Sequence, residues 1–179
     1  MKLRTALAVV SALVLAPVAA AEDVKIAGMT SKTPAGWKDE PSTSEMRLAQ
    51  FKLPKAEGDK EDAELVIFYF KGGSGSAEQN LNRQLAKFQP AEGEKELKVK
   101  VDKVKVGKHE APYQDIQGTY LSKSPPFDPK AKVTLKAEYR QLYVPLITDS
   151  GDYYVILLGP DKTVEMHKKD FEEWLKNFK

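Results

Sequence analysis

Two short segments made of β-branched, aliphatic and aromatic residues constrain the fold more than any other feature of the chain. Residues 65–70 read Leu-Val-Ile-Phe-Tyr-Phe, and residues 153–158 read Tyr-Tyr-Val-Ile-Leu-Leu. A strand that is apolar on both faces lies in the middle of a sheet whose two faces are both covered. The sequence therefore predicts two central strands, with other elements packed on each side of the sheet.

The rest of the chain supplies more strands and two helices. Ser76 and Gln79 have the spacing of a capping box at the start of a first helix, and a last amphipathic helix carries Phe171 and Trp174. Hairpin connections dominate between them. We therefore expect an α+β domain with a mainly antiparallel sheet flanked by two helices, arranged as an α/β/α sandwich or a two-layer variant. Further strands are predicted over residues 46–53, 97–106, 113–121 and 133–147.

The lysine-rich strand over residues 97–106 has two distinctive features. Lysine alternates with valine in its first half, which is typical of an edge strand. Its apolar residues change face at Asp102 and Lys103, which predicts a two-residue turn or a bulge there.

The N-terminus has the pattern of a cleavable signal peptide. Lys2 and Arg4 precede the apolar stretch 6–18, and the alanines at 19–21 form the small-residue cleavage pattern. A buried N-terminal helix, the alternative, would need a polar face that residues 6–18 lack. We therefore expect a signal peptide over 1–21, a single domain over 22–179, and export to the periplasm or the extracellular space.

Composition excludes several classes of partner and site. The chain has no cysteine, so disulfides, thiolate metal sites and a lipoprotein anchor are excluded. Without Lys2 and Arg4 the 28 basic residues fall to 26, which equals the 26 acidic residues. A neutral mature chain does not favour nucleic acid or an anionic membrane as partner. We expect no cofactor, no metal, and no integral membrane segment after cleavage.

The glycine-serine loop before the first helix is a candidate anion-binding or catalytic site. Gly73, Ser74, Gly75 and Ser76 follow a predicted strand, where main-chain N–H groups and hydroxyls can face a ligand. The loop matches neither a nucleophile elbow nor a phosphate loop, because Ser76 and Glu78 stand where those motifs need other residues. A flexible connector that caps the helix is the alternative interpretation.

Tyr139, Gln141 and Tyr143 share one face of a predicted strand and form a candidate binding stripe. Tyrosine offers a large amphipathic contact surface, so the stripe could hold a peptide or a glycan. The alternative is that the stripe lies under a helix, because a sheet face normally needs cover.

Other catalytic signals are weak. His109 and His167 do not have the spacing of metal ligands, and they fit solvated surface residues. Acidic residues alternate with lysines, as on a solvated face, although a pair of catalytic carboxylates can be remote in sequence. We expect no catalytic residue that the sequence alone would identify.

Several short motifs carry a resemblance to known families. The chain resembles the PsbP-like and Ran-binding Mog families and small secreted bacterial proteins that share their architecture. The motifs are Pro34-Ala35-Gly36-Trp37, Leu53-Pro54, and Leu157-Leu158-Gly159-Pro160 before a helix with Phe171, Leu175 and Phe178. The resemblance implies an antiparallel sheet between helices and a binding or accessory role.

The sequence thus favours an exported, non-enzymatic binding or accessory protein. Its expected partner is an envelope or extracellular protein, a peptide or a glycan. The alternative is a small secreted hydrolase that uses Ser74 or a carboxylate pair.

Overall fold

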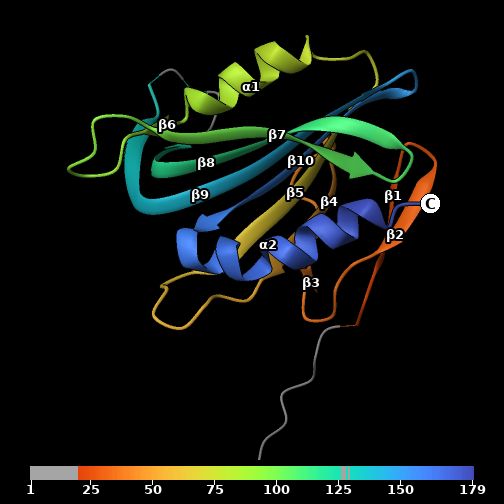
Figure 1. The fold of residues 1–179 in the computed structure, drawn as a ribbon, viewed down its shortest axis with the longest axis horizontal. Coiled ribbons are helices and arrows are strands. Elements are labelled where there is room, and N and C mark those ends of the chain that lie inside the picture. Colours follow the sequence, from red (N-terminus) through yellow and green to blue (C-terminus); the bar gives the residue numbers. More distant parts are fainter. Residues whose placement is uncertain (1–19, 126–127, 129) are drawn as a thin grey trace, which may run out of the picture.

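The computed structural model describes residues 20–125, 128 and 130–179, so most of the predicted signal peptide lies outside the described residues. Figure 1 shows its arrangement of strands and helices. The helices are α1 (Ala77–Leu85) and α2 (Asp161–Lys176). The strands are β1 (Asp23–Ile26), β2 (Met29–Lys32), β3 (Lys38–Asp39), β4 (Arg47–Leu53), β5 (Ala63–Phe70), β6 (Phe88–Gln89), β7 (Lys98–Val106), β8 (His109–Ser124), β9 (Lys132–Thr148) and β10 (Gly151–Pro160).

The main sheet has eight strands and places the two apolar segments side by side. Its order is β3-β4-β5-β10-β9-β8-β6, and β7 pairs with β8 on the same edge as β6. Every strand pair in it is antiparallel, with Val155 of β10 opposite Ile67 of β5. The predicted α+β class, mostly antiparallel sheet and two helices are confirmed, and β5 and β10 are interior strands of the sheet.

One face of the sheet carries the main hydrophobic core under α2. Phe171, Trp174 and Leu175 of α2 pack over Leu142 and Val155 of the sheet, and all five are fully buried or nearly so. Burial of each such side chain stabilises the fold by about 1.5–3 kcal/mol. The indole of Trp174 also meets that of Trp37 edge-on, with ring centroids 5.5 Å apart. This contact anchors the loop that carries Trp37 to α2.

A carboxylate from a distant loop caps helix α2. The helix follows Pro160, which offers no capping side chain. Asp59, between β4 and β5, accepts hydrogen bonds from the Thr163 main-chain N–H at 3.0 Å and from its hydroxyl at 2.6 Å. Because the first N–H groups of a helix lack internal partners, this carboxylate stabilises the N-terminus of α2 and fixes it against the sheet.

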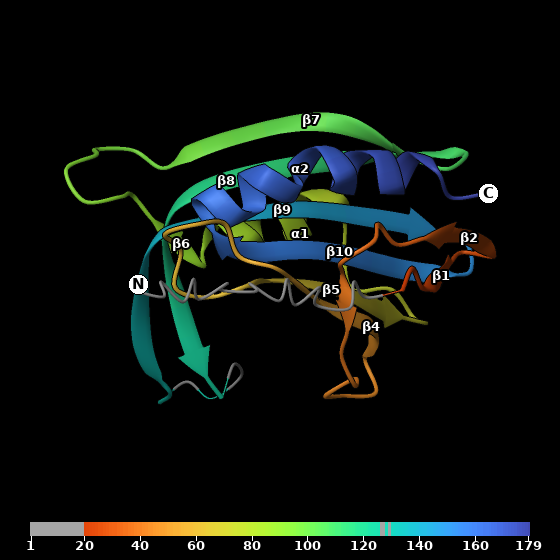
Figure 2. The same cartoon turned by 90° about the horizontal axis from the view of Figure 1, so that it is seen from below.

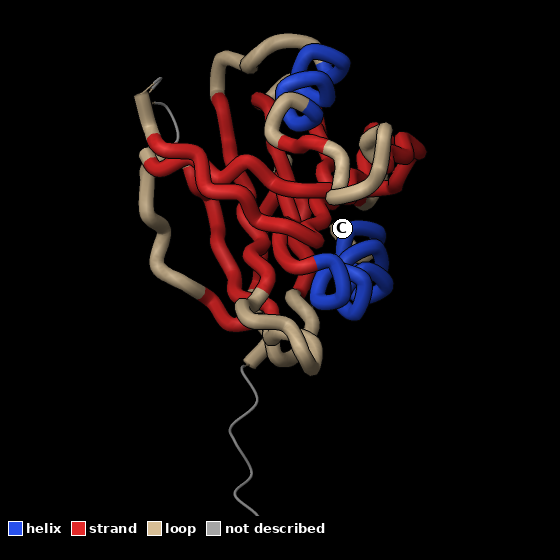
Figure 3. Tube along the Cα trace, turned by 90° about the vertical axis from the view of Figure 1, so that its left-hand side faces the viewer, coloured by secondary structure: helices blue, strands red, loops and turns tan. Residues whose placement is uncertain are grey.

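The opposite face of the sheet is covered only in part, by α1. Helix α1 has nine residues and turns the polar side chains of Asn80 and Gln84 inward. It contacts β8, β9 and β10, and the two helices lie apart with strands between them (Figure 3). Among the described residues, no helix is long and apolar enough to cross a membrane.

Phe68 and Ile156 are less buried than we expect for central strands with both faces covered. Both side chains point to the α1 face and are half-buried, whereas Ile67 and Val155 on the α2 face are fully buried. The main strand contacts of α1 are with β9 and β8, so the helix does not cover the whole of this face. The α/β/α sandwich arrangement stays a prediction, because the cover on this side is incomplete.

Strand β7 is continuous, so the predicted turn or bulge at Asp102 and Lys103 is wrong. It pairs with β8 without a register shift from Lys98 opposite Gln117 to Val106 opposite His109. The change of apolar face has another cause: the valines of the first half face solvent on the α1 side, and those of the second half are buried under α2. An irregularity occurs instead between β8 and β9, beside Gly118, where Glu138 has a positive φ of 54°.

Candidate functional site

The predicted tyrosine stripe lies under α1. Tyr139, Gln141 and Tyr143 are exposed to only 7%, 1% and 1%, respectively. The amide of Gln141 donates a hydrogen bond to Gln84 of α1 at 3.3 Å, and the Tyr143 ring stacks on Tyr154 with centroids 6.1 Å apart. Gln141 and Tyr143 therefore belong to the surface on which α1 packs, and a ligand could reach these two residues only if α1 moved.

Tyr139 closes a small polar cluster at one end of the stripe. Its hydroxyl hydrogen-bonds to Glu61, and Lys136 donates to that hydroxyl at 3.0 Å. Burial and then the Glu61 contact raise the pKa of Tyr139 to about 12, so the phenol stays neutral at physiological pH. The cluster ties the loop before β5 to β9. A cavity of about 190 Å³ lies beside it, lined by Asp59, Ala91, Glu94, Glu96, Lys98, Gln117, Gly118, Glu138, Tyr139, Asp161 and Lys162.

The glycine-serine loop is held by the chain's own side chains. The Ser74 hydroxyl donates to the Tyr154 hydroxyl at 2.6 Å, and the Ser74 N–H donates to the Asp152 carboxylate at 3.0 Å. Gly73 and Gly75 both have positive φ, at 74° and 100°, which explains why the loop needs glycine. The carboxylate of Asp152 thus takes an N–H group that an anionic ligand would need.

The predicted capping box is confirmed in the same loop. Ser76 accepts from the Gln79 N–H at 3.2 Å, and the Gln79 side chain accepts from the Ser76 N–H at 3.0 Å. This arrangement matches the connector and helix cap that was the alternative to an anion site.

Histidine does not contribute to the hydrogen bonds around Ser74. His167 contacts the Pro54 carbonyl oxygen at 2.8 Å from α2, so it is tied to the protein and not freely solvated. His109 begins β8, at the end of the sheet where β7 turns back. Within the described ranges, no group of three or more histidines or carboxylates is placed to hold a metal ion.

A buried ion cluster under α2 was not expected from the sequence. Arg140 of β9 donates to both oxygens of Asp115 of β8, at 2.7 Å each, and Lys168 of α2 donates to Asp115 at 2.7 Å. Arg140 also contacts Asp161 and Glu165 at the start of α2. Burial alone would raise the pKa of Asp115, but the hydrogen bonds from Arg140 and Lys168 lower it overall. The cluster therefore joins two strands and a helix through charged groups.

The signal for this cluster is present in the sequence. Asp115 is the single charge within residues 111–122, and Arg140 directly precedes the uncharged run 141–148; a charged residue in such a segment needs a partner. What the sequence does not provide is the pairing, because it depends on the register between β8 and β9.

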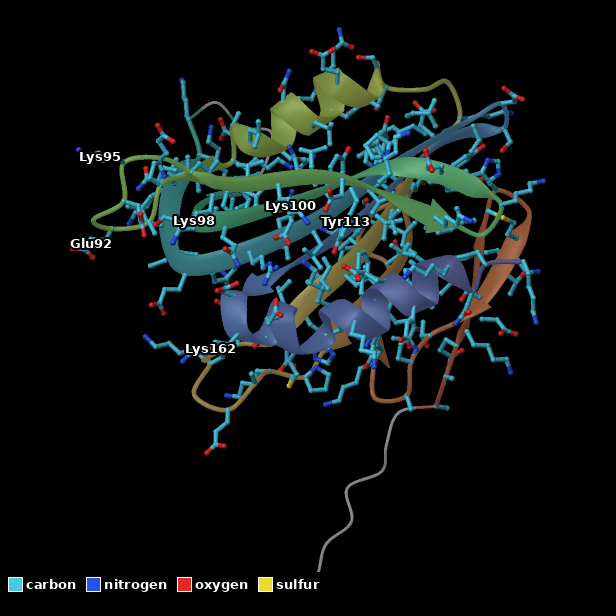
Figure 4. All side chains as sticks on the ribbon, in the orientation of Figure 1. Glu92, Lys95, Lys98, Lys100, Tyr113 and Lys162 are labelled. Carbon is cyan, nitrogen blue, oxygen red and sulfur yellow. The ribbon has the colours of Figure 1, made fainter. Side chains whose placement is uncertain are left out.

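A groove runs between β7 and α2, beside the ion cluster. Its volume is about 730 Å³, and Figure 4 shows Lys100 and Tyr113 on this side of the structure. Tyr113 donates to Glu172 at 3.0 Å, and Lys168 lies 5.9 Å from the centre of its ring. The groove is lined by Lys100, Asp102, Lys103, Val104, Lys105, Glu110, Tyr113, Asp115, Lys168, Glu172 and Lys176.

The charges of the groove are only partly balanced. Asp102 pairs with Lys100 at 2.6 Å, and Glu110 pairs with Lys103 at 2.7 Å. In the described part of the chain, Lys105 and Lys176 have no such ion pair. The groove can therefore accept negative charge from a ligand.

The chain is similar to a distant neighbour among solved structures. The crystal structure of PA94, a Pseudomonas aeruginosa protein of unknown function, is similar at a TM-score of 0.44 and 15% sequence identity. The match covers 86% of this chain and 92% of that protein. No protein-family model and no curated protein matches the sequence. The resemblance to the PsbP-like and Mog families stays a prediction.

Proposed function

We propose that this is an exported, non-enzymatic binding or accessory protein, and that it binds its partner on the β7 side of the sheet. The observation that carries the proposal is the open outer edge of β7 beside the β7–α2 groove. Together they offer main-chain hydrogen-bonding groups, lysines and a concave surface in one place. Export is part of the proposal and rests on the N-terminal sequence pattern.

The position of β7 supports this assignment. It runs along the outer rim of the structure, next to α2 (Figure 2). At the other edge of the sheet, β3 has only two residues and presents little main chain for binding. The β7 side is therefore the longer accessible edge.

The rigid floor of the groove also supports binding. Asp115 and Tyr113 are fixed by hydrogen bonds to neighbouring elements, so a ligand would meet an already ordered surface. A preformed surface lowers the conformational entropy lost on binding.

The geometry around Ser74 gives little support to the hydrolase alternative. Ser74 donates to a phenol whose pKa is raised, first by burial, and no histidine of the described residues hydrogen-bonds to it. A serine nucleophile needs a base that can take its proton. Ser74 instead anchors the loop to β10.

Comparative partner capture tests the proposed function. The protein is expressed in its own host from the full-length sequence with an affinity tag, and co-purifying proteins are quantified. We compare the wild type with Lys100→Glu/Lys176→Glu, which reverses two exposed charges of the groove. The matched control is Lys38→Glu/Lys71→Glu, which makes the same change in net charge at β3 and after β5.

We expect a partner to co-purify equally with the wild type and the control, and at least tenfold less with the groove variant. Equal recovery from both variants would exclude the groove as the binding surface. Turnover of ester, glycoside or peptide substrates at enzyme-like rates by the purified protein would overturn the non-enzymatic proposal.

A further inference from the structure

Strand β7 has one paired edge and one open edge. Its inner edge pairs with β8 along the whole strand, from Lys98 to Val106. Apart from this pairing, none of the described residues forms a main-chain hydrogen bond with β7. The outward N–H and C=O groups are therefore available to another extended chain.

The first half of β7 has a two-sided chemical pattern. The side chains of Lys98 and Lys100 are 61% and 73% exposed and belong to the α2 side, which they share with Asp115 across the ladder. Val99 and Val101 are 41% and 52% exposed and belong to the α1 side. Lys98 pairs with Glu94 at 3.0 Å and Lys100 pairs with Asp102 at 2.6 Å, but both ion pairs are exposed and therefore weak, so an acidic strand could replace them. An added strand would thus meet lysines on one face and apolar surface on the other.

We propose that β7 binds an extended acidic segment of a partner protein, which adds to the sheet as a further strand. This inference rests on the proposed function and specifies the kind of partner that the protein binds. Main-chain hydrogen bonds supply affinity in such additions, and side chains on alternating positions supply specificity. Opposite charges on facing residues of neighbouring strands stabilise the pair.

Charge disfavours a second copy of this chain as the strand that pairs with the open edge of β7. Strand β7 carries four lysines and a single aspartate, so self-pairing would bring two cationic strands together. Lysines on edge strands prevent such self-association in many proteins. The same lysines attract a chain of opposite charge.

The pattern also predicts the sequence character of the partner segment. Residues facing Lys98 and Lys100 are expected to be acidic, and those facing Val99 and Val101 are expected to be apolar. Because strand side chains alternate between faces, the segment should alternate acidic and apolar residues.

Fluorescence anisotropy with synthetic peptides tests the inference on the full protein. The probe is a labelled ten-residue peptide that alternates glutamate and valine, with blocked ends. A second peptide has the same sequence with every amide N-methylated, which keeps the charges but removes the main-chain donors. A third peptide replaces each glutamate by lysine.

We expect only the unmodified acidic peptide to bind, with at least tenfold weaker binding after N-methylation or charge reversal. The variant Lys98→Glu/Lys100→Glu should lose binding, and the control Lys38→Glu/Lys71→Glu should keep it. Amide hydrogen exchange of the wild type should slow along β7 when the acidic peptide is added, which provides a readout independent of the variants.

Equal binding of the N-methylated peptide would overturn strand addition, as would exchange protection confined to other strands. Either result would still be compatible with the proposed function if the native partner is captured by the wild type and lost from the groove variant. Failure of peptide binding together with loss of groove-dependent capture would refute both.

Discussion

Arg140 of β9 holds both carboxylate oxygens of Asp115 of β8 through two parallel hydrogen bonds of 2.7 Å, beneath helix α2. Both residues are more than 90% buried, counting their main chains. Such bidentate pairs are among the strongest hydrogen-bonded contacts between side chains. The pair fixes the register of β8 against β9, and through Lys168 it fixes α2 on the sheet.

Removal of Arg140 should be strongly destabilising. Arg140→Met keeps the volume but leaves the Asp115 carboxylate buried with Lys168 as its remaining cation, which should cost about 3–5 kcal/mol in the free energy of unfolding. Urea unfolding followed by circular dichroism measures the loss. Lys103→Met breaks an exposed ion pair with Glu110 and should leave stability unchanged. A cost below about 1 kcal/mol for Arg140→Met would contradict the role of the cluster.

Acid should weaken the fold through the same carboxylate. The pKa of Asp115 is lower in the folded protein than its ordinary value, because hydrogen bonds from Arg140 and Lys168 outweigh the effect of burial. The unfolded chain therefore binds a proton first, and this stability is fully present above about pH 4 and is lost as pH falls through the folded pKa. Unfolding free energies measured from pH 6 to pH 2 should decline less steeply in Asp115→Asn than in the wild type. Equal slopes would show that Asp115 does not carry the effect.

The tyrosine stripe should behave as core. Tyr143 is 1% exposed under α1, so Tyr143→Ala should destabilise the protein by about 3–5 kcal/mol, as large-to-small changes in cores do. Changing Tyr139 and Tyr143 together to serine should unfold the protein or nearly so. A folded double variant that no longer captures its partner would instead identify the stripe as the binding surface.

The two serines of the loop before α1 should have small, structural effects. Ser76→Ala removes the helix cap and should cost about 1 kcal/mol. Ser74→Ala removes the hydrogen bond to Tyr154 and should cost about as much. Thermal unfolding measures both losses. A selective loss of hydrolytic turnover in a folded Ser74→Ala variant would restore the hydrolase interpretation.

Features that depend on local sequence were predictable. The capping box needs only Ser76 and Gln79, three residues apart, and the apolar character of β5 and β10 follows from their composition alone. The edge position of β7 also follows, because lysines that alternate with valines are typical of an edge strand.

Features that depend on tertiary neighbours were not predictable. The buried face of α1 carries the polar residues Asn80 and Gln84, which hydrogen-bond to Tyr154 and Gln141 of the sheet below. The partial exposure of Phe68 depends on how much of this face of the sheet α1 covers. The pairing of Asp115 with Arg140 depends on strand register, which charge patterns along one strand do not specify.

Hydrogen exchange on the native complex tests the central claim most directly. The tagged full-length protein is isolated from its own host with its partner bound, and amide exchange is compared with that of the free protein. The account predicts slower exchange over β7 and the facing side of α2, with β3 and β4 unchanged. Protection that spares β7 and maps to the half-buried face around Phe68 would contradict the assignment of the β7 side as the binding surface.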